Sequence, residues 1–208
     1  LFWNQAKDQT LGQRRCPCAT ARMPLLEQKR LFIAIELPPD VKKRIQSMQN
    51  ELKKCGPDVK WVEPENIHLT LKFLGNVETK NANKIGELLK KNFSSNKSFK
   101  VTLDRLGCFP SLHSPRILWA GFEDKQNNSK KIARLLGGSL NDREFQLHAT
   151  LGRFRSPRNK IAFIEQIEEI NRGFKPYDLY VDNITLFESK LSPKGPAYSI
   201  LRSVKFLR

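Results

Sequence analysis

The sequence predicts an α+β fold in which one unit of strands and helices occurs twice. Strand-like and helix-like stretches follow the order strand, helix, strand, helix, two strands, helix, strand, helix, two strands. A His-x-Thr tripeptide lies in the strand after the first helix of each unit, at residues 68–70 and 148–150. The two units cover about residues 31–109 and 116–206, so an internal duplication is expected.

Each expected element rests on a hydrophobic pattern. Alternating or continuous apolar stretches predict strands, and apolar residues three and four apart predict helices. In the first unit these patterns give strand 30–37, helix 41–52, strand 66–75, helix 80–93 and strand 99–109. In the second unit they give strand 116–122, helix 129–140, strand 146–154, a helix marked by Ile161, Ile164, Ile167 and Ile170, and strands 179–189 and 197–206 joined by a Pro-Lys-Gly-Pro turn.

The chain divides into a short extension and one domain. Residues 1–29 show no sustained helical or strand period, so we expect a flexible extension there, ahead of a single domain at 30–208. A basic tail that contacts RNA is the alternative for this segment. The 208 residues are enough for one large domain or two small lobes.

The net charge of +16 favours an anionic partner. Residues 31–208 alone carry 31 basic and 19 acidic residues, so the surplus belongs to the domain itself. Such a surface attracts RNA or DNA first and membranes second. The alternative is that these lysines only keep helix faces solvated.

Cysteine usage and the apolar runs point to a reducing compartment. The four cysteines, at positions 16, 18, 55 and 108, are sparse and irregular, which fits the cytoplasm. Cys16 and Cys18 lack the C-x₂₋₄-C spacing of zinc sites, so free thiols are favoured over metal binding. The longest apolar run near the start, LFIAI, is far too short to cross a membrane, and no signal peptide is recognisable.

The two tripeptides can supply acid–base chemistry. Alternate residues of a strand share a face, so His68, Thr70 and Lys72 are expected together, with Leu69, Leu71 and Phe73 on the core side. In the second copy His148 and Thr150 share a face, while Ala149 and Leu151 point inward. The only other histidine, His113, lies in a loop without the pattern.

Two imidazoles form an acid–base pair near neutral pH, because histidine titrates there. One imidazole can take a proton from water while the other gives a proton to a leaving oxygen. The threonine hydroxyls can donate to phosphate oxygens, where negative charge grows in the transition state. No carboxylate cluster accompanies the motifs, so neither a metal nor another cofactor is expected. This set suits hydrolysis of a phosphodiester, most easily a strained cyclic one.

The chain resembles the 2H phosphoesterases, and within them the RNA 2′,3′-cyclic phosphodiesterases of bacteria and archaea, also called 2′-5′ RNA ligases. The matching stretches are RLFIAIELP (30–38), NIHLTLKFLG (66–75), FPSLHSPRILWAG (109–121), HATLGRF (148–154) and SKLSPKGPAYSIL (189–201). The resemblance implies two pseudosymmetric lobes, each an antiparallel sheet flanked by helices, around a central cleft. It implies a protein that opens a 2′,3′-cyclic phosphate at an RNA 3′ end to a 2′-phosphate, with reversible 2′-5′ ligation as a further activity. We expect this protein to be a monomer.

The resemblance also implies residue roles. His68 would be the general acid, His148 the general base that activates water, and Thr70 and Thr150 would hold the phosphate. Arg153, five residues after His148, would help to bind it. Arg153 has the wrong parity to share a face with His148 in a flat strand, so a bulge or the strand end must turn it.

Three further residues are candidates for substrate binding. Relatives carry an aromatic residue in the first strand that stacks on the base, and Phe32 is predicted in that place, with Ile33 as the alternative position. Arg116 and Tyr198 are candidate cleft residues. Their alternatives are a surface arginine at a strand start and a core tyrosine.

Two other classes of function remain open. One is a non-catalytic RNA- or nucleotide-binding module, although binding alone does not need two titratable imidazoles. The other is a related phosphodiesterase acting on 2′,5′-linked oligonucleotides or a small cyclic phosphate. The charge of the domain favours a polymer over a small metabolite.

Overall fold

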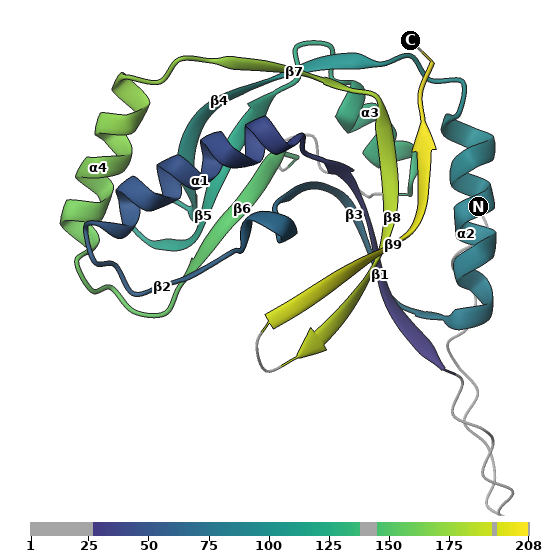
Figure 1. Ribbon diagram of the computed structural model, residues 1–208, viewed down its shortest axis with the longest axis horizontal. Helices are drawn as coiled ribbons and strands as arrows, with labels where there is room; N and C mark the ends of the chain where they lie inside the picture. The colour runs from purple at the N-terminus through teal and green to yellow at the C-terminus, as the bar shows by residue number, and fades with distance from the viewer. Residues whose placement is uncertain (1–26, 138–144, 193–194, 208) are drawn as a thin grey trace, which may run out of the picture.

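The computed structural model describes residues 27–137, 145–192 and 195–207. Their nine strands form one curled sheet in which every strand pair is antiparallel (Figure 1). The strands are β1 (Gln28–Glu36), β2 (Val59–Trp61), β3 (His68–Glu78), β4 (Phe99–Pro110), β5 (Pro115–Glu123), β6 (His148–Phe154), β7 (Tyr177–Val181), β8 (Asn183–Ser192) and β9 (Gly195–Lys205). The helices are α1 (Pro39–Lys53), α2 (Thr79–Phe93), α3 (Asn128–Leu135) and α4 (Lys160–Arg172), with a 3₁₀ turn at Pro64–Asn66. The predicted α+β class is confirmed.

The sheet consists of two halves that meet at its centre. Its strand order is β7-β4-β5-β6-β3-β1-β8-β9, with β2 attached beside β3 on the edge of β6. The halves join through a single residue pair between β3 and β6, Leu69 with Ala149. The halves of the sheet are not the halves of the chain, because β4 of the first unit pairs with β5 and β7, and β8 of the second pairs with β1.

Several expected elements differ from those observed. The expected strand 179–189 is two strands, because the chain leaves β4 after β7 and joins β1 as β8. The short strand β2 was not predicted. The described part of the expected helix 129–140 is helical only to Leu135, and residues 138–140 lie outside the described residues. Residues 193–194 of the expected turn and residues 1–26 of the expected extension, including Cys16 and Cys18, also lie outside them.

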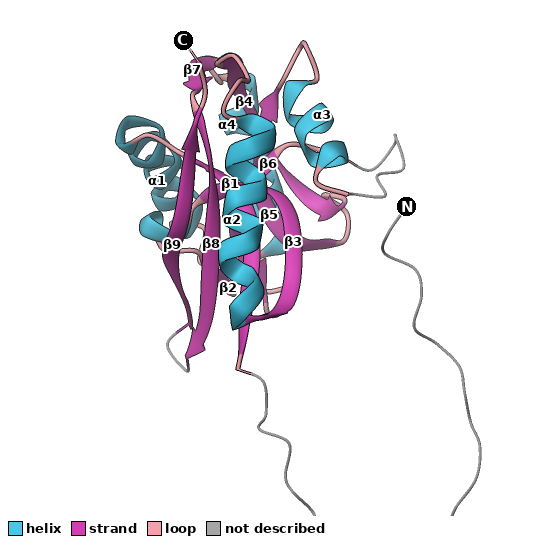
Figure 2. Ribbon diagram, turned by 90° about the vertical axis from the view of Figure 1, so that its right-hand side faces the viewer, coloured by secondary structure: helices cyan, strands magenta, loops and turns pink. Residues whose placement is uncertain are grey.

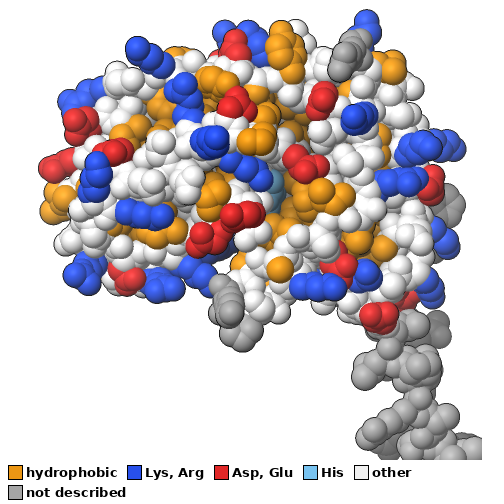
Figure 3. Space-filling model, viewed as in Figure 1, with side chains coloured by type: hydrophobic (Ala, Val, Ile, Leu, Met, Phe, Trp, Pro, Cys, Tyr) orange, Lys and Arg blue, Asp and Glu red, His pale blue; other side chains and the backbone are white. Residues whose placement is uncertain are grey.

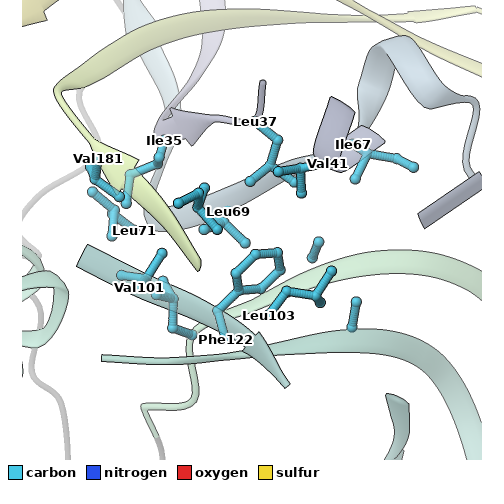
Figure 4. Close-up of a cluster of buried hydrophobic side chains, with 14 of the residues drawn as sticks. Ile35, Leu37, Val41, Ile67, Leu69, Leu71, Val101, Leu103, Phe122 and Val181 are labelled. Atoms are coloured by element: carbon cyan, nitrogen blue, oxygen red, sulfur yellow. The ribbon is translucent and has the colours of Figure 1, made fainter. Parts of the chain in front are cut away.

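All four helices pack on one face of the sheet. The core joins apolar residues of the helices to Leu69 and Leu71 of β3 and to Ala149 and Leu151 of β6, as the alternation predicted. Figure 4 shows part of this core, where Val41 of α1 lies near Leu37 and Leu69. Figure 2 shows α2 lying across the outer face of the half that contains β1, β8 and β9. The opposite face, which carries the motif histidines and threonines, has no covering helix in the described ranges.

A bulge in β3 follows the first motif directly. Thr70 pairs with Ala34 of β1, but the next pair joins Lys72 to Ile33, so Leu71 has no partner. The extra residue reverses the alternation beyond it. Phe73 therefore lies on the face of His68, where it is 67% exposed, and Lys72 leaves that face to donate to the Gly137 carbonyl. The predictions that Phe73 packs in the core and that Lys72 shares the motif face are wrong.

A second bulge lies at the matching place in β6. Thr150 pairs with Trp119 of β5 and Gly152 with Leu118, which leaves Leu151 without a partner. The bulge turns Arg153 onto the face of Thr150, as its place in the family pattern requires. Both motifs thus continue as His-x-Thr, one bulged leucine, and a side chain five residues after the histidine that returns to the same face.

Candidate active site

The pairing of Leu69 with Ala149 brings the two motifs together. Because the strands run antiparallel, this pair places His68 beside Thr150 and Thr70 beside His148. The two histidines are therefore diagonal neighbours across the junction of the halves. Residues in this relation lie roughly 7–8 Å apart, with their Cβ atoms somewhat closer. A space of this size between two imidazoles and two hydroxyls suits a phosphate group.

Each imidazole is held in the same way by the backbone just before its strand. Nδ1 of His68 donates to the carbonyl oxygen of Asn66 at 2.7 Å, and Nδ1 of His148 donates to that of Gln146 at 2.7 Å. A carbonyl oxygen can only accept, so in the neutral ring the proton is on Nδ1 and Nε2 carries the lone pair. Both Nε2 atoms are therefore free to accept or deliver a proton.

Burial lowers the pKa of both histidines. The pKa of His68 falls to about 4, because its surroundings exclude water, with smaller effects of the positive charges of Lys42 and of His148. The pKa of His148 is lowered mainly by burial, and the hydrogen bond to Gln146 opposes this.

Aromatic rings supply the apolar wall around His68. Phe32 lies 4.8 Å from the His68 ring, between centroids, and stacks on Phe187 at 5.0 Å. Tyr198 meets the edge of both rings, at 5.2 Å from His68 and 4.9 Å from Phe32. Phe32 is only 3% exposed and forms part of the cavity wall beside His68.

Fewer aromatic rings surround His148 than His68. Phe109 of β4 meets its ring at 5.0 Å, edge to face, and packs in turn on Trp119 at 5.2 Å. Phe109 and Phe187 occupy matching places, since each pairs with the strand next to its motif strand. The two histidines thus have aromatic neighbours in matching places, but His68 is more fully enclosed than His148.

A cavity of about 760 Å³ opens beside the motifs, a size typical of ligand sites. Figure 3 shows histidine at the bottom of a hollow on this face, with Lys, Arg and carboxylates around it. The predicted site residues that line the cavity are His68, Thr70, Thr150, Arg153, Phe32 and Tyr198. His148 lies next to this wall without lining it. A smaller cavity of about 190 Å³, between residues 35–38 and 180–183, contains none of the predicted site residues.

Arg116 does not belong to this group. It is exposed at the start of β5 and is not part of the cavity wall. Tyr198 does belong to it, because it lines the cavity. Burial raises the pKa of its hydroxyl, and the charges of Arg153 and Arg30 oppose the rise. Arg153, Arg30 and Tyr198 thus all lie on the wall of the cavity.

Sequence reasoning missed Phe73, Arg30, Lys60 and Arg155, all of which line the cavity. A signal for Phe73 was present. Phe73 lies five residues after His68, as Arg153 lies five residues after His148. The orientation of Arg153 requires a bulge after the second motif, so a bulge could also have been expected after the first. Lys60 gave no signal, because a three-residue strand has too short a pattern to predict its partner.

The described residues contain no group of three or more His, Cys, Asp or Glu side chains arranged to hold a metal ion. The site offers instead two imidazoles, two hydroxyls and the guanidinium group of Arg153. These groups can move protons and bind a phosphate.

Comparison with known proteins places the chain in a family. The pattern of the LigT like Phosphoesterase family matches residues 35–119 and 123–198. The RNA 2′,3′-cyclic phosphodiesterase of Thermotoga maritima is 34% identical over 182 residues, covering 85% of this chain and 95% of that protein. The chain belongs to the LigT-like phosphoesterase family. The RNA 2′,3′-cyclic phosphodiesterase of Methanothermobacter thermautotrophicus is 30% identical over 82% of this chain and 95% of its own.

Solved structures share the fold. Escherichia coli LigT complexed with 3′-AMP matches with a TM-score of 0.65 and 26% identity, over 88% of this chain and all of that chain. The protein TT0787 of Thermus thermophilus matches with a TM-score of 0.66 and 26% identity, over 85% and 97%. The resemblance expected from the motifs is confirmed. None of the helices in the described ranges is long and apolar enough to cross a membrane.

Proposed function

We propose that this protein hydrolyses 2′,3′-cyclic phosphates at RNA 3′ ends and leaves a 2′-phosphate and a 3′-hydroxyl. One observation carries the proposal: the Leu69–Ala149 pair sets two His-x-Thr motifs against each other, with both Nε2 atoms free. The names of the relatives, RNA 2′,3′-cyclic phosphodiesterase, support the substrate class.

The reaction divides between the histidines. Nε2 of His148 takes a proton from water, whose oxygen attacks the phosphorus atom. The bond from phosphorus to the ribose 3′-oxygen breaks, and Nε2 of His68 gives its proton to that oxygen. Thr70, Thr150 and Arg153 donate hydrogen bonds to the non-bridging oxygens, where negative charge increases. If an RNA 5′-hydroxyl replaces water, the same steps form a 2′-5′ linkage, which is the proposed ligation.

The base of the terminal nucleotide lies against aromatic side chains. Phe73 exposes most of its ring to the cavity and lies 6.1 Å from Phe32, between centroids. We assign to Phe73 and Tyr198 the stacking contact that was first predicted for Phe32. The proposal includes that the protein is a monomer and lies in the cytoplasm. The free thiols of Cys55 and Cys108 support this compartment.

Hydrolysis is expected to be independent of metal ions. The groups that move protons and bind phosphate are all side chains of the motifs, so the reaction needs no Lewis acid. The test is to incubate the protein with an RNA ending in a 2′,3′-cyclic phosphate, with and without EDTA, and to identify the product terminus. We expect a 2′-phosphate product that forms at the same rate with and without EDTA. Activity that disappears with EDTA and returns with one divalent ion would contradict this prediction, and no hydrolysis would favour the non-catalytic module.

The pH dependence should differ between kcat/KM and kcat. In the free protein the pKa of His68 is about 4, so this general acid loses its proton, and activity falls, as the pH rises through that value. The pKa of His148 is also lowered, so this general base becomes protonated, and activity falls on the acid side, only below pH 6.5. The optimum of kcat/KM should therefore be acidic. Bound phosphate stabilises the imidazolium, so the optimum of kcat should lie at higher pH. Both parameters measured from pH 4 to 8 test this, and coinciding optima near pH 7 would refute it.

A further inference from the structure

We propose that Lys60 and Arg155 form a subsite for the phosphodiester group that precedes the terminal nucleotide, so that the protein prefers single-stranded RNA to a mononucleotide. The inference rests on the proposed function and names the part of the substrate beyond the cyclic phosphate. It draws on a row of cations along one side of the cavity.

Register places these cations in one row. Lys60 of β2 is paired with Arg153 of β6, so the two side chains lie on the same face of neighbouring strands. Pairing continues past the end of β6, where the Arg155 N–H donates to the Asp58 carbonyl oxygen at 2.9 Å. Arg155 lies two residues beyond Arg153, which in a strand is about 6.7 Å along the same face. All three line the cavity, and the row leads away from Thr150.

The two strands that carry Lys60 and Arg153 are joined by packing and by hydrogen bonds. Val59 of β2 lies so close to Gly152 that a Cβ at that position would come within 2.5 Å of it. The amide of Gln49, a buried residue of α1, donates at 3.0 Å both to the Val62 carbonyl beside β2 and to the Leu151 carbonyl in β6. Lys60 and Arg153 are therefore carried by strands that are held together beneath them.

The charges of the row are not neutralised by the described residues. Lys60, Arg153 and Arg155 form no ion pair with any carboxylate in that part of the chain. Among the described residues that line the cavity, Glu63 is the only one with a carboxylate, against these three cations and Arg30. Cations without partners at a cavity are suited to successive phosphates, because each phosphate they bind releases counterions.

The distribution of side chains in the cavity gives the direction of the RNA. Phe73, Tyr198 and Leu191 lie on the side formed by β1, β3 and the β8–β9 hairpin, and they suit the terminal base. The cations of β2 and β6 lie on the other side. With the cyclic phosphate between the histidines, the base therefore occupies the aromatic side, and the chain toward the 5′ end leaves over Lys60 and Arg155.

The test compares three substrates in the wild type and in the double variant Lys60→Gln/Arg155→Gln. The substrates are a dinucleotide ending in a 2′,3′-cyclic phosphate, the same dinucleotide with an uncharged methylphosphonate linkage, and the mononucleoside 2′,3′-cyclic phosphate. In the wild type kcat/KM should be at least about tenfold higher for the dinucleotide than for the mononucleoside, as charged hydrogen bonds contribute. The methylphosphonate should resemble the mononucleoside, and the double variant should bring the ratio close to one.

The control variant, Lys84→Gln/Lys90→Gln, removes the same charge from the exposed face of α2, and it should keep the wild-type ratio. A wild-type ratio near one, an unchanged ratio in the double variant, or a methylphosphonate as good as the dinucleotide would overturn the subsite. If the wild type hydrolyses none of the three, the proposed function fails. Binding of single-stranded RNA then decides the subsite: the slope of log K against log salt should be smaller by about 0.7 in the double variant, for one lost phosphate contact, and an equal slope overturns it.

Discussion

Replacement of either motif histidine by alanine is expected to lower kcat by about 10²–10⁴-fold, the usual range for a positioned acid or base. Each imidazole is oriented by the carbonyl two residues before it, which leaves its Nε2 to exchange protons with the substrate. The double variant should lose less than the product of the two single losses, because the residues act in one step. His113→Ala, on an exposed loop, is the control and should leave kcat unchanged.

The same variants assign the roles. A substrate with sulfur in place of the 3′ bridging oxygen needs little acid help, since a thiolate leaves without protonation. It should restore activity to His68→Ala and leave His148→Ala inactive. Recovery of the His148 variant alone would reverse the assignment, and recovery of neither would mean that both histidines bind phosphate rather than move protons. Single-turnover rates measure the chemical step directly.

Much of the fold could be predicted because local patterns determine it. Strands β1, β3 and β5 and helices α1 and α2 agree with the expected elements to within a few residues, since each buries a regular apolar stripe. The crossing of β4 and β8 between halves could not be predicted. An apolar run shows that a strand is buried and does not show which strand lies beside it. The break at Asp182 between β7 and β8 is a change of partner within a continuous strand-like pattern.

The site was predictable where it depended on residue type and not where it depended on backbone irregularity. The repeated tripeptide predicted the four central side chains. The bulges at Leu71 and Leu151 decide which later residues face the cavity, and an alternation rule cannot place them, because they arise from pairing with β1 and β5. For that reason Phe73 was expected in the core. Only the required orientation of Arg153 indicated a bulge in advance.

The second large effect is expected at Phe32. Phe32→Ala should lower the free energy of unfolding by about 3–5 kcal/mol, the usual range for a truncated buried aromatic. Its ring is stacked on Phe187 and covered by Tyr198, so its removal leaves a cavity that these neighbours fill only in part. Equilibrium denaturation measures the loss. Phe73→Ala, which removes an exposed ring, is the matched control and should change stability little.

Phe32→Ala should also raise the pKa of His68 from about 4 toward the ordinary value of 6.5. Burial is the largest cause of the lowered pKa, and the space left by the Phe32 ring admits water beside the imidazole. Because a folded-state pKa below the unfolded one makes stability fall as the pH falls through 6.5, the acid sensitivity of the fold should also decrease in the variant. NMR titration of the His68 ring, with Phe32→Leu as the apolar control, follows the pKa. If Phe32 instead stacks on the base, Phe32→Ala should raise KM and leave both stability and the His68 pKa unchanged, whereas our assignment gives that KM effect to Phe73→Ala.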